Sequence, residues 1–199
     1  MPAAIGKLRP SDCVLAFGIP TSEDEFWEAQ GDSHRDFVKG QVWEKYDFQF
    51  VSHLRKVEPR LLKLGLKVVH KLTLRDFGRL LRDPSNTVVI LFSHWAGRTV
   101  EFFDGMATED EIVGVIPSDF DGIVDLTICH PEHLPMRIRN HLPPTSLVKY
   151  TDEENTPVVW LYFYWAVFTI LDDSHNTGSG DSGVSYLEAL ERAVEEFKK

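Results

Sequence analysis

Cysteines and long apolar runs are both scarce in this chain. Two cysteines in 199 residues are too few for a disulfide scaffold, and no CxxC pair is present to hold a metal. This scarcity predicts a reducing compartment. The N-terminus has no apolar segment of the secretory type, and the longest apolar run, 158–171, is shorter than the roughly 20 residues that span a bilayer. We therefore expect a cytoplasmic protein without a membrane partner.

Positive charge is also in deficit. Lys and Arg total 21 against 31 Asp and Glu, which gives a formal net charge of −10 at pH 7. Nucleic acids attract basic surfaces, so this balance argues against nucleic acid as a partner. The contents of hydrophobic residues, 43%, and of charged residues, 26%, are typical of a folded globular protein.

Apolar runs rich in β-branched residues predict strands at 14–19, 66–70, 87–92, 123–129 and 146–150. Helical spacing or helix-capping patterns begin near Phe48, Thr73, Thr108, Thr156 and Ser185. This alternation predicts an α/β fold, a three-layer sandwich with a mostly parallel central sheet and helices on both faces. We expect residues 1–199 to form a single domain. Residues 21–47 show neither the apolar spacing of a helix nor the alternation of a strand. They are predicted to be a surface excursion after the first strand, here called the excursion.

Two reactive side chains lie at the carboxyl ends of predicted strands. His94 comes after the run 87–92, and Cys129 ends the run 123–129. Reactive groups gather outside the carboxyl ends of parallel strands, so the imidazole and the thiol would emerge side by side if the strands are neighbours. A histidine can take the thiol proton, and an imidazolium lowers the pKa of a thiol. Each residue alone also has a plain structural interpretation, a buried small hydrophobe for the cysteine and a surface group for the histidine.

The second thiol has a different context. Cys13 begins a strand instead of ending one. It is therefore predicted to be a packed thiol of the core.

The order of these motifs resembles the caspase-like cysteine peptidases, and most closely the bacterial CHAT domains. In those families the catalytic histidine follows the third core strand and the catalytic cysteine follows the fourth. The segment 100–106 resembles the short strand and Asp-Gly turn after the CHAT histidine, and 108–116 resembles the helix that comes next. The segment 146–153 resembles the strand and acidic residues after the nucleophile. The resemblance covers about residues 85–199.

This resemblance implies a cysteine endopeptidase that hydrolyses a peptide bond in a protein substrate. Cys129 would be the nucleophile and His94 the general acid and base, with no cofactor and no metal ion. Backbone N–H groups of Cys129 and of the residue just after His94 would hold the oxyanion. A single-domain peptidase needs control, so we expect its activity to depend on a regulatory protein partner, an activating cleavage or an oligomer. The resemblance also implies a role in bacterial defence or stress signalling.

Four further positions are predicted to form the oxyanion and substrate pocket. The family prefers glycine directly after its histidine, whereas this chain has Trp95 there and Gly97 two positions later. Metacaspases carry an aspartate for basic substrate side chains two residues before the cysteine, where this chain has Thr127. Asp152 is a candidate to supply the acid instead, and its alternative interpretation is a solvated residue at a helix start.

Two alternatives remain beside the peptidase. The first is a catalytically silent caspase-like module that binds a partner protein through the aromatic residues of the excursion, and the departure at Trp95 favours it. The second is a zinc site at His130, His133 and His141 with Cys129 and Glu132, but the spacing follows no compact zinc motif and the neighbouring prolines impede a helical ligand face. We therefore expect no metal site.

Overall fold

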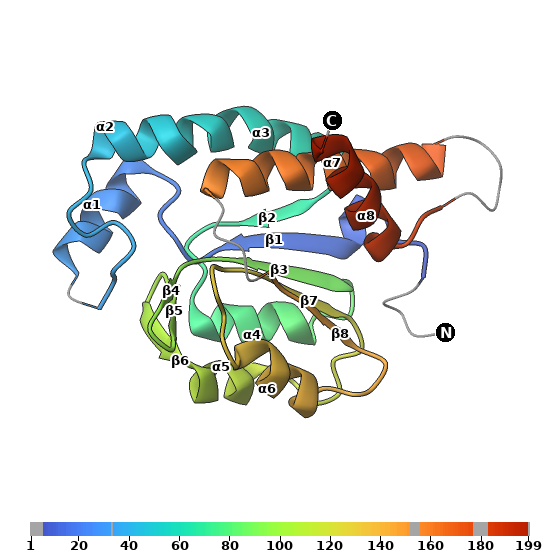
Figure 1. The fold of residues 1–199 in the computed structure, drawn as a ribbon. Coiled ribbons are helices and arrows are strands. Elements are labelled where there is room, and N and C mark those ends of the chain that lie inside the picture. The colour runs from blue at the N-terminus through green and yellow to red at the C-terminus, as the bar shows by residue number, and fades with distance from the viewer. Residues whose placement is uncertain (1–5, 33, 152–155, 177–182, 199) are drawn as a thin grey trace.

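The computed structural model describes residues 6–32, 34–151, 156–176 and 183–198. Its centre is a five-stranded parallel sheet with the order β2-β1-β3-β7-β8 (Figure 1). The strands are β1 (Cys13–Phe17), β2 (Lys67–Val69), β3 (Val88–Phe92), β7 (Ile123–Thr127) and β8 (Leu147–Lys149). A 3-10 turn, η2 (Pro10–Asp12), precedes β1. The five predicted strands and the parallel sheet are confirmed.

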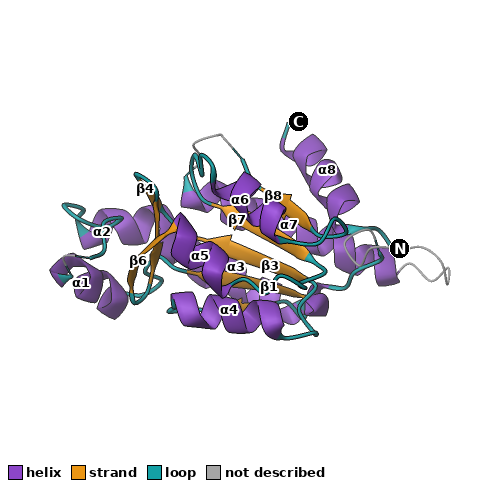
Figure 2. Cartoon of the chain, turned by 90° about the horizontal axis from the view of Figure 1, so that it is seen from below, coloured by secondary structure: helices purple, strands orange, loops and turns teal. Residues whose placement is uncertain are grey.

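Helices cover both faces of this sheet, as the sequence predicts. One face carries α3 (Ser52–Lys63), α7 (Pro157–Asn176) and α8 (Tyr186–Phe197), and the other carries α4 (Leu74–Arg82), α5 (Glu109–Val115) and α6 (Leu134–His141) (Figure 1). Figure 2, seen from below, shows α4, α5 and α6 in front of the sheet. Successive residues of β3 alternate between the two apolar cores, with Ile90 and Phe92 on the α7 side and Val89 and Leu91 on the α4 side.

The helices begin where the capping patterns predict. The Thr73 hydroxyl accepts a hydrogen bond from the Asp76 N–H, while Thr108 and Ser185 form capping boxes with the glutamates three positions on. The long apolar run lies inside α7, which starts at Pro157. Within the described residues, no helix combines the length and the apolar character needed to cross a membrane.

The excursion contains more regular structure than the sequence predicts. It holds α1 (Glu23–Gly31) and α2 (Trp43–Tyr46), and α2 continues through a π-helical turn, η3 (Asp47–Val51), into α3. The expectation that residues 21–47 show neither helical nor strand periodicity is wrong for α1. The buried apolar residues of α1 are Phe26 and Ala29, which form a narrow apolar stripe with little periodic signal in the sequence. The Ser22 side chain caps the helix.

A second, antiparallel sheet follows β3 at once. It consists of β4 (Trp95–Ala96), β5 (Thr99–Phe102) and β6 (Gly105–Thr108) in that order. Gly97 and Arg98 have φ angles of 50° and 80°, the left-handed conformations that a two-residue turn between right-twisted strands requires. This small sheet therefore turns the chain sharply at the carboxyl end of β3.

Candidate active site

His94 and Cys129 occupy equivalent places beyond two neighbouring strands. β3 and β7 pair in parallel with Phe92 opposite Thr127, and the Ser93 N–H donates to the Thr127 carbonyl at 3.1 Å. His94 and Cys129 each lie two residues beyond that last pair, and both are half-buried. Neighbouring strands run about 4.8 Å apart. The condition set by the sequence, that the two strands adjoin, is therefore met.

The imidazole of His94 is packed against an aromatic ring of the excursion. The ring centroids of His94 and Phe37 are 4.9 Å apart. Burial lowers the pKa of His94 below its ordinary value, and the carboxylates of Glu101 and Asp36 offset this effect in part. The imidazole is therefore neutral near pH 7, which is the form that accepts a proton.

A buried ion pair fixes the segment that carries Phe37. Arg35 Nε donates to Glu101 Oε1 at 3.1 Å, with both side chains inaccessible to solvent. Arg35 Nη2 also donates to the Gly18 carbonyl at 3.3 Å, and the Phe37 N–H donates to Glu101 Oε2 at 2.8 Å. These contacts join the excursion to β5 and to the end of β1. Sequence reasoning missed them, although a glutamate inside the apolar strand 99–102 is a signal that could have found this anchor.

Trp95 turns its side chain away from the imidazole. Trp95 is 9% exposed and packs in the apolar core on the α4 side, because it follows His94 directly in the alternation of the strand. The Glu101 N–H donates to the His94 carbonyl at 3.0 Å, and the next pair along, Trp95 with Val100, is then of the non-hydrogen-bonded type. The Trp95 N–H therefore faces away from β5. Gly97 lies in the exposed turn between β4 and β5.

Thr127 lies beneath the site, inside a closed polar network. It is 2% exposed, and its hydroxyl is 2.5 Å from that of Tyr164. Lys149 donates to the Tyr164 hydroxyl at 3.2 Å and lies 3.0 Å from an oxygen of the buried Asp125. The Tyr186 hydroxyl donates to the other Asp125 oxygen at 2.7 Å. Thr127 thus supports the end of β7, and its hydroxyl faces this network instead of an open pocket.

The two thiols differ as the sequence predicts. Cys13 is inaccessible to solvent, and its burial raises the pKa of the thiol far above its ordinary value. Cys129 is half-buried and precedes a sharp turn, in which His130 and Glu132 have φ angles of 47° and 44°. Of the two cysteines, Cys129 is therefore the one that is accessible to solvent.

The other sequence candidates are placed as follows. His130 and His133 are exposed, and His141 Nε2 lies 2.8 Å from the Ile116 carbonyl. Among the described residues, no group of three or more His, Cys, Asp or Glu side chains could hold a metal ion. Asp152 lies outside the described residues.

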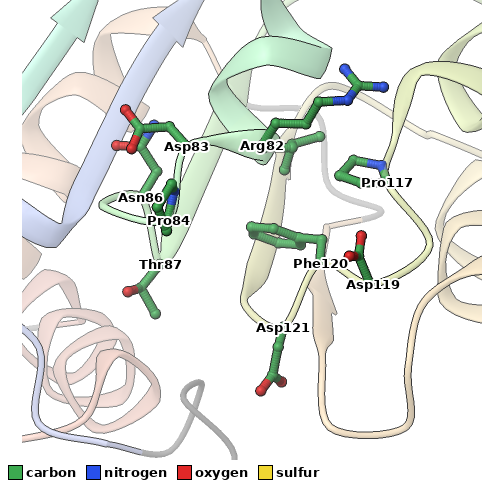
Figure 3. Close-up of a pocket in the computed structure, with 10 residues that line it drawn as sticks. Arg82, Asp83, Pro84, Asn86, Thr87, Pro117, Asp119, Phe120 and Asp121 are labelled. Atoms are coloured by element: carbon green, nitrogen blue, oxygen red, sulfur yellow. The ribbon is translucent and has the colours of Figure 1, made fainter.

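Two cavities lie at opposite edges of the sheet. One of about 610 Å³ lies at the amino ends of β3 and β7, between the loops that precede these strands (Figure 3). Arg82, Asp83, Phe120 and Asp121 are among its lining residues. A second, of about 410 Å³, includes Phe37 in its lining, and the Phe37 ring also packs on the His94 ring. The parallel-sheet rule places reactive groups at the carboxyl edge, where this second cavity lies.

Comparisons of the sequence with protein-family models and with curated proteins give no significant match to this chain.

Proposed function

We propose that this chain is a caspase-like cysteine endopeptidase of the CHAT type, with Cys129 as nucleophile and His94 as general acid and base. The observation that carries the proposal is the register of β3 and β7, which puts the two residues at equivalent positions beyond adjacent strands. The neutral state of the half-buried His94 supports it further, because a general base must be unprotonated before it acts.

The chemistry follows from these two groups. His94 takes the thiol proton of Cys129, and the thiolate attacks the carbonyl carbon of the scissile peptide bond. His94 then gives this proton to the leaving nitrogen as the C–N bond breaks, which leaves a thioester and a free amine. Water attacks the thioester while His94 accepts its proton, and the carboxylic acid and the thiol are released.

The oxyanion of each step needs preorganised donors. The backbone N–H groups of Cys129 and Trp95 are the candidates, and donors of this kind each contribute about 3–4 kcal/mol to transition-state stabilisation. The tryptophan side chain packs in the core on the α4 side of the sheet, whereas the His94 ring packs on Phe37 of the excursion. The departure from glycine at this position is therefore compatible with catalysis.

The test is mass spectrometry of a diverse peptide library incubated with the full chain. We expect wild type and Cys13→Ala to cut peptides at the same bonds, while Cys129→Ala cuts none. Cys13→Ala is the matched control because it removes the other thiol of the chain. Cleavage that survives in Cys129→Ala would overturn the proposal.

A catalytically silent module remains the second candidate, and the exposure of Trp27 favours it. This side chain of α1 is 53% exposed and is available to a partner protein. The same partner could regulate an active enzyme. If wild type cuts nothing, either alone or with proteins that copurify with it, the silent module becomes the better account.

A further inference from the structure

The cleft beside His94 has a chemistry suited to one kind of ligand. We propose that it binds a large apolar side chain, aromatic or aliphatic, of the polypeptide substrate. This inference rests on the proposed peptidase function, and it adds the substrate class that the sequence leaves open. The cleft measures about 410 Å³ and lies between the excursion, η3 and the first residues of α7.

Its walls are mainly aromatic and aliphatic. The aromatic rings of Phe37, Tyr46, Phe48 and Phe50 line it, together with Pro157 and Val158 of α7. The other described lining residues are polar, namely Gln41, Gln49, His53 and Thr156, and none of the described lining residues is Asp, Glu, Lys or Arg. Burying a charged side chain there without a partner would be costly, whereas an apolar side chain gains free energy on leaving water.

Two aromatic contacts link the cleft to His94 and to the end of β3. The Phe37 ring that lines the cleft also packs on the His94 ring, at 4.9 Å between centroids. Phe50 stacks on Phe92 at 5.8 Å, and Phe92 lies two residues before His94 in the chain. A side chain in the cleft would therefore belong to a residue close to the scissile bond.

The inner walls of the cleft are fixed before any ligand arrives. Glu101 anchors the backbone of Phe37, and the Tyr46 hydroxyl donates to the Pro20 carbonyl at 2.6 Å. Phe48, in contrast, is 74% exposed at the rim. A substrate side chain would cover this exposed ring, and rigid inner walls reduce the entropy lost on binding.

The first experiment measures binding without catalysis. Cys129→Ala protein is mixed with dye-labelled pentapeptides that differ at one position, Phe, Leu, Lys or Glu, in an alanine background. Affinity is measured by fluorescence polarisation, and occupancy of the cleft is followed from the methyl NMR signals of Val158, assigned by their absence in Val158→Trp. We expect the Phe and Leu peptides to bind about tenfold tighter or more than the Lys and Glu peptides, and to shift the Val158 signals.

Matched variants locate the binding. Val158→Trp fills the cleft and should remove the preference for Phe and Leu. Val159→Trp makes the same change at the adjacent position of α7, which is 39% exposed and does not line the cleft, and should leave the preference intact. Phe48→Asp, at an exposed site, is a second cleft variant in case Val158→Trp does not fold. Equal binding of all four peptides, no binding, or a preference that survives in both cleft variants would overturn the inference.

A covalent experiment separates this inference from the proposed function. Wild type is treated with peptidyl acyloxymethyl ketones that carry the same four side chains at either of the two residues before the ketone. The Cys129 thiolate displaces the carboxylate of the probe and forms a thioether, which mass spectrometry detects. Apolar binding at Val158 without a thioether on Cys129 would overturn the peptidase and keep the cleft. Thioether formation at equal rates for all four side chains would keep the peptidase and overturn the cleft.

Discussion

The two edges of the central sheet each carry a cavity, and the two cavities differ in chemistry. The amino edge has the larger one, about 610 Å³, lined in part by the exposed carboxylates of Asp83, Asp119 and Asp121 (Figure 3). The carboxyl edge has the cleft of about 410 Å³, with aromatic walls and the half-buried His94 beside it. The described residues that line the larger cavity include no imidazole and no thiol. The two cavities therefore differ more in the chemistry of their linings than in their volumes.

The edges also differ in where their polar contacts lie. At the carboxyl edge, Arg35 and Glu101 pair with no exposure to solvent. At the amino edge, Arg82 is exposed and donates to the carbonyls of Gly78 and Val115. Buried contacts carry large penalties when one partner is removed, whereas exposed contacts are exchanged for water at little cost.

The largest expected effect comes from breaking this pair. Arg35→Met leaves Glu101 buried without its cation, and we expect it to lower the free energy of unfolding by about 3–5 kcal/mol. Arg82→Met at the amino edge should cost about 1 kcal/mol, because water replaces its contacts. Urea unfolding of both variants measures the difference. Equal losses would show that the two edges do not differ in this respect.

The second expected effect concerns the pH profile of peptide cleavage. Since burial lowers the pKa of His94, the acidic limb of kcat/KM should have its midpoint below about 6.5, the ordinary value for histidine. Asp36→Asn removes a carboxylate that raises this pKa and should move the limb further toward acid. Asp119→Asn, at the amino edge, should leave the limb in place. A limb that moves toward alkaline pH in Asp36→Asn would contradict this assignment.

The smallest expected effects are changes of folding stability with pH, which have opposite signs at the two edges of the sheet. His70 follows β2 at the carboxyl edge, where its hydrogen bond to Glu58 and the nearby carboxylates of Glu58 and Glu25 raise its pKa against the opposing effect of burial. Its contribution to stability is complete below the unfolded-state pKa and is lost as the pH rises through the folded value. The pKa of Asp83 at the amino edge is lowered by hydrogen bonds from Ser85. Its contribution is present above the unfolded-state pKa and is lost as the pH falls through the folded value.

Urea unfolding across a pH series checks both signs. The gap in stability between wild type and His70→Gln should be wider near about pH 5 than near about pH 9. The gap between wild type and Asp83→Asn should be wider near about pH 7 than near about pH 3. Gaps that do not change with pH would remove this contrast between the edges.

Local patterns were enough to predict the central sheet and most helices. Each strand is a short apolar run, and the caps at Thr73, Thr108 and Ser185 mark helix starts within a few residues. The α1 helix was missed because a mostly polar helix with a narrow apolar stripe has little periodic signal. The excursion owes its arrangement to the Arg35–Glu101 pair, whose members lie 66 residues apart. Local reading of a sequence does not detect a pairing at that separation.

The candidate site likewise has parts that local patterns predict and parts that depend on contacts between residues far apart in the sequence. His94 and Cys129 could be proposed from sequence because each follows an apolar strand, and parallel strands bring their carboxyl ends together. The burial of Thr127 could not be predicted from the sequence, since its hydroxyl contacts the Tyr164 hydroxyl of α7. The role of Phe37 beside His94 was hidden for a similar reason, because the excursion reaches His94 through contacts with β5.

The buried thiol of Cys13 can report how often the central sheet opens. Cys13 lies in β1, between β2 and β3, and its pKa is raised far above the ordinary range. A thiol reagent can reach its sulfur only after the sheet opens, so the rate of its modification counts opening events of the central core. Half-buried Cys129 reports the folded state in the same reaction tube. A time series of mass spectra therefore separates the reactivity of Cys129 from the rate at which the core opens.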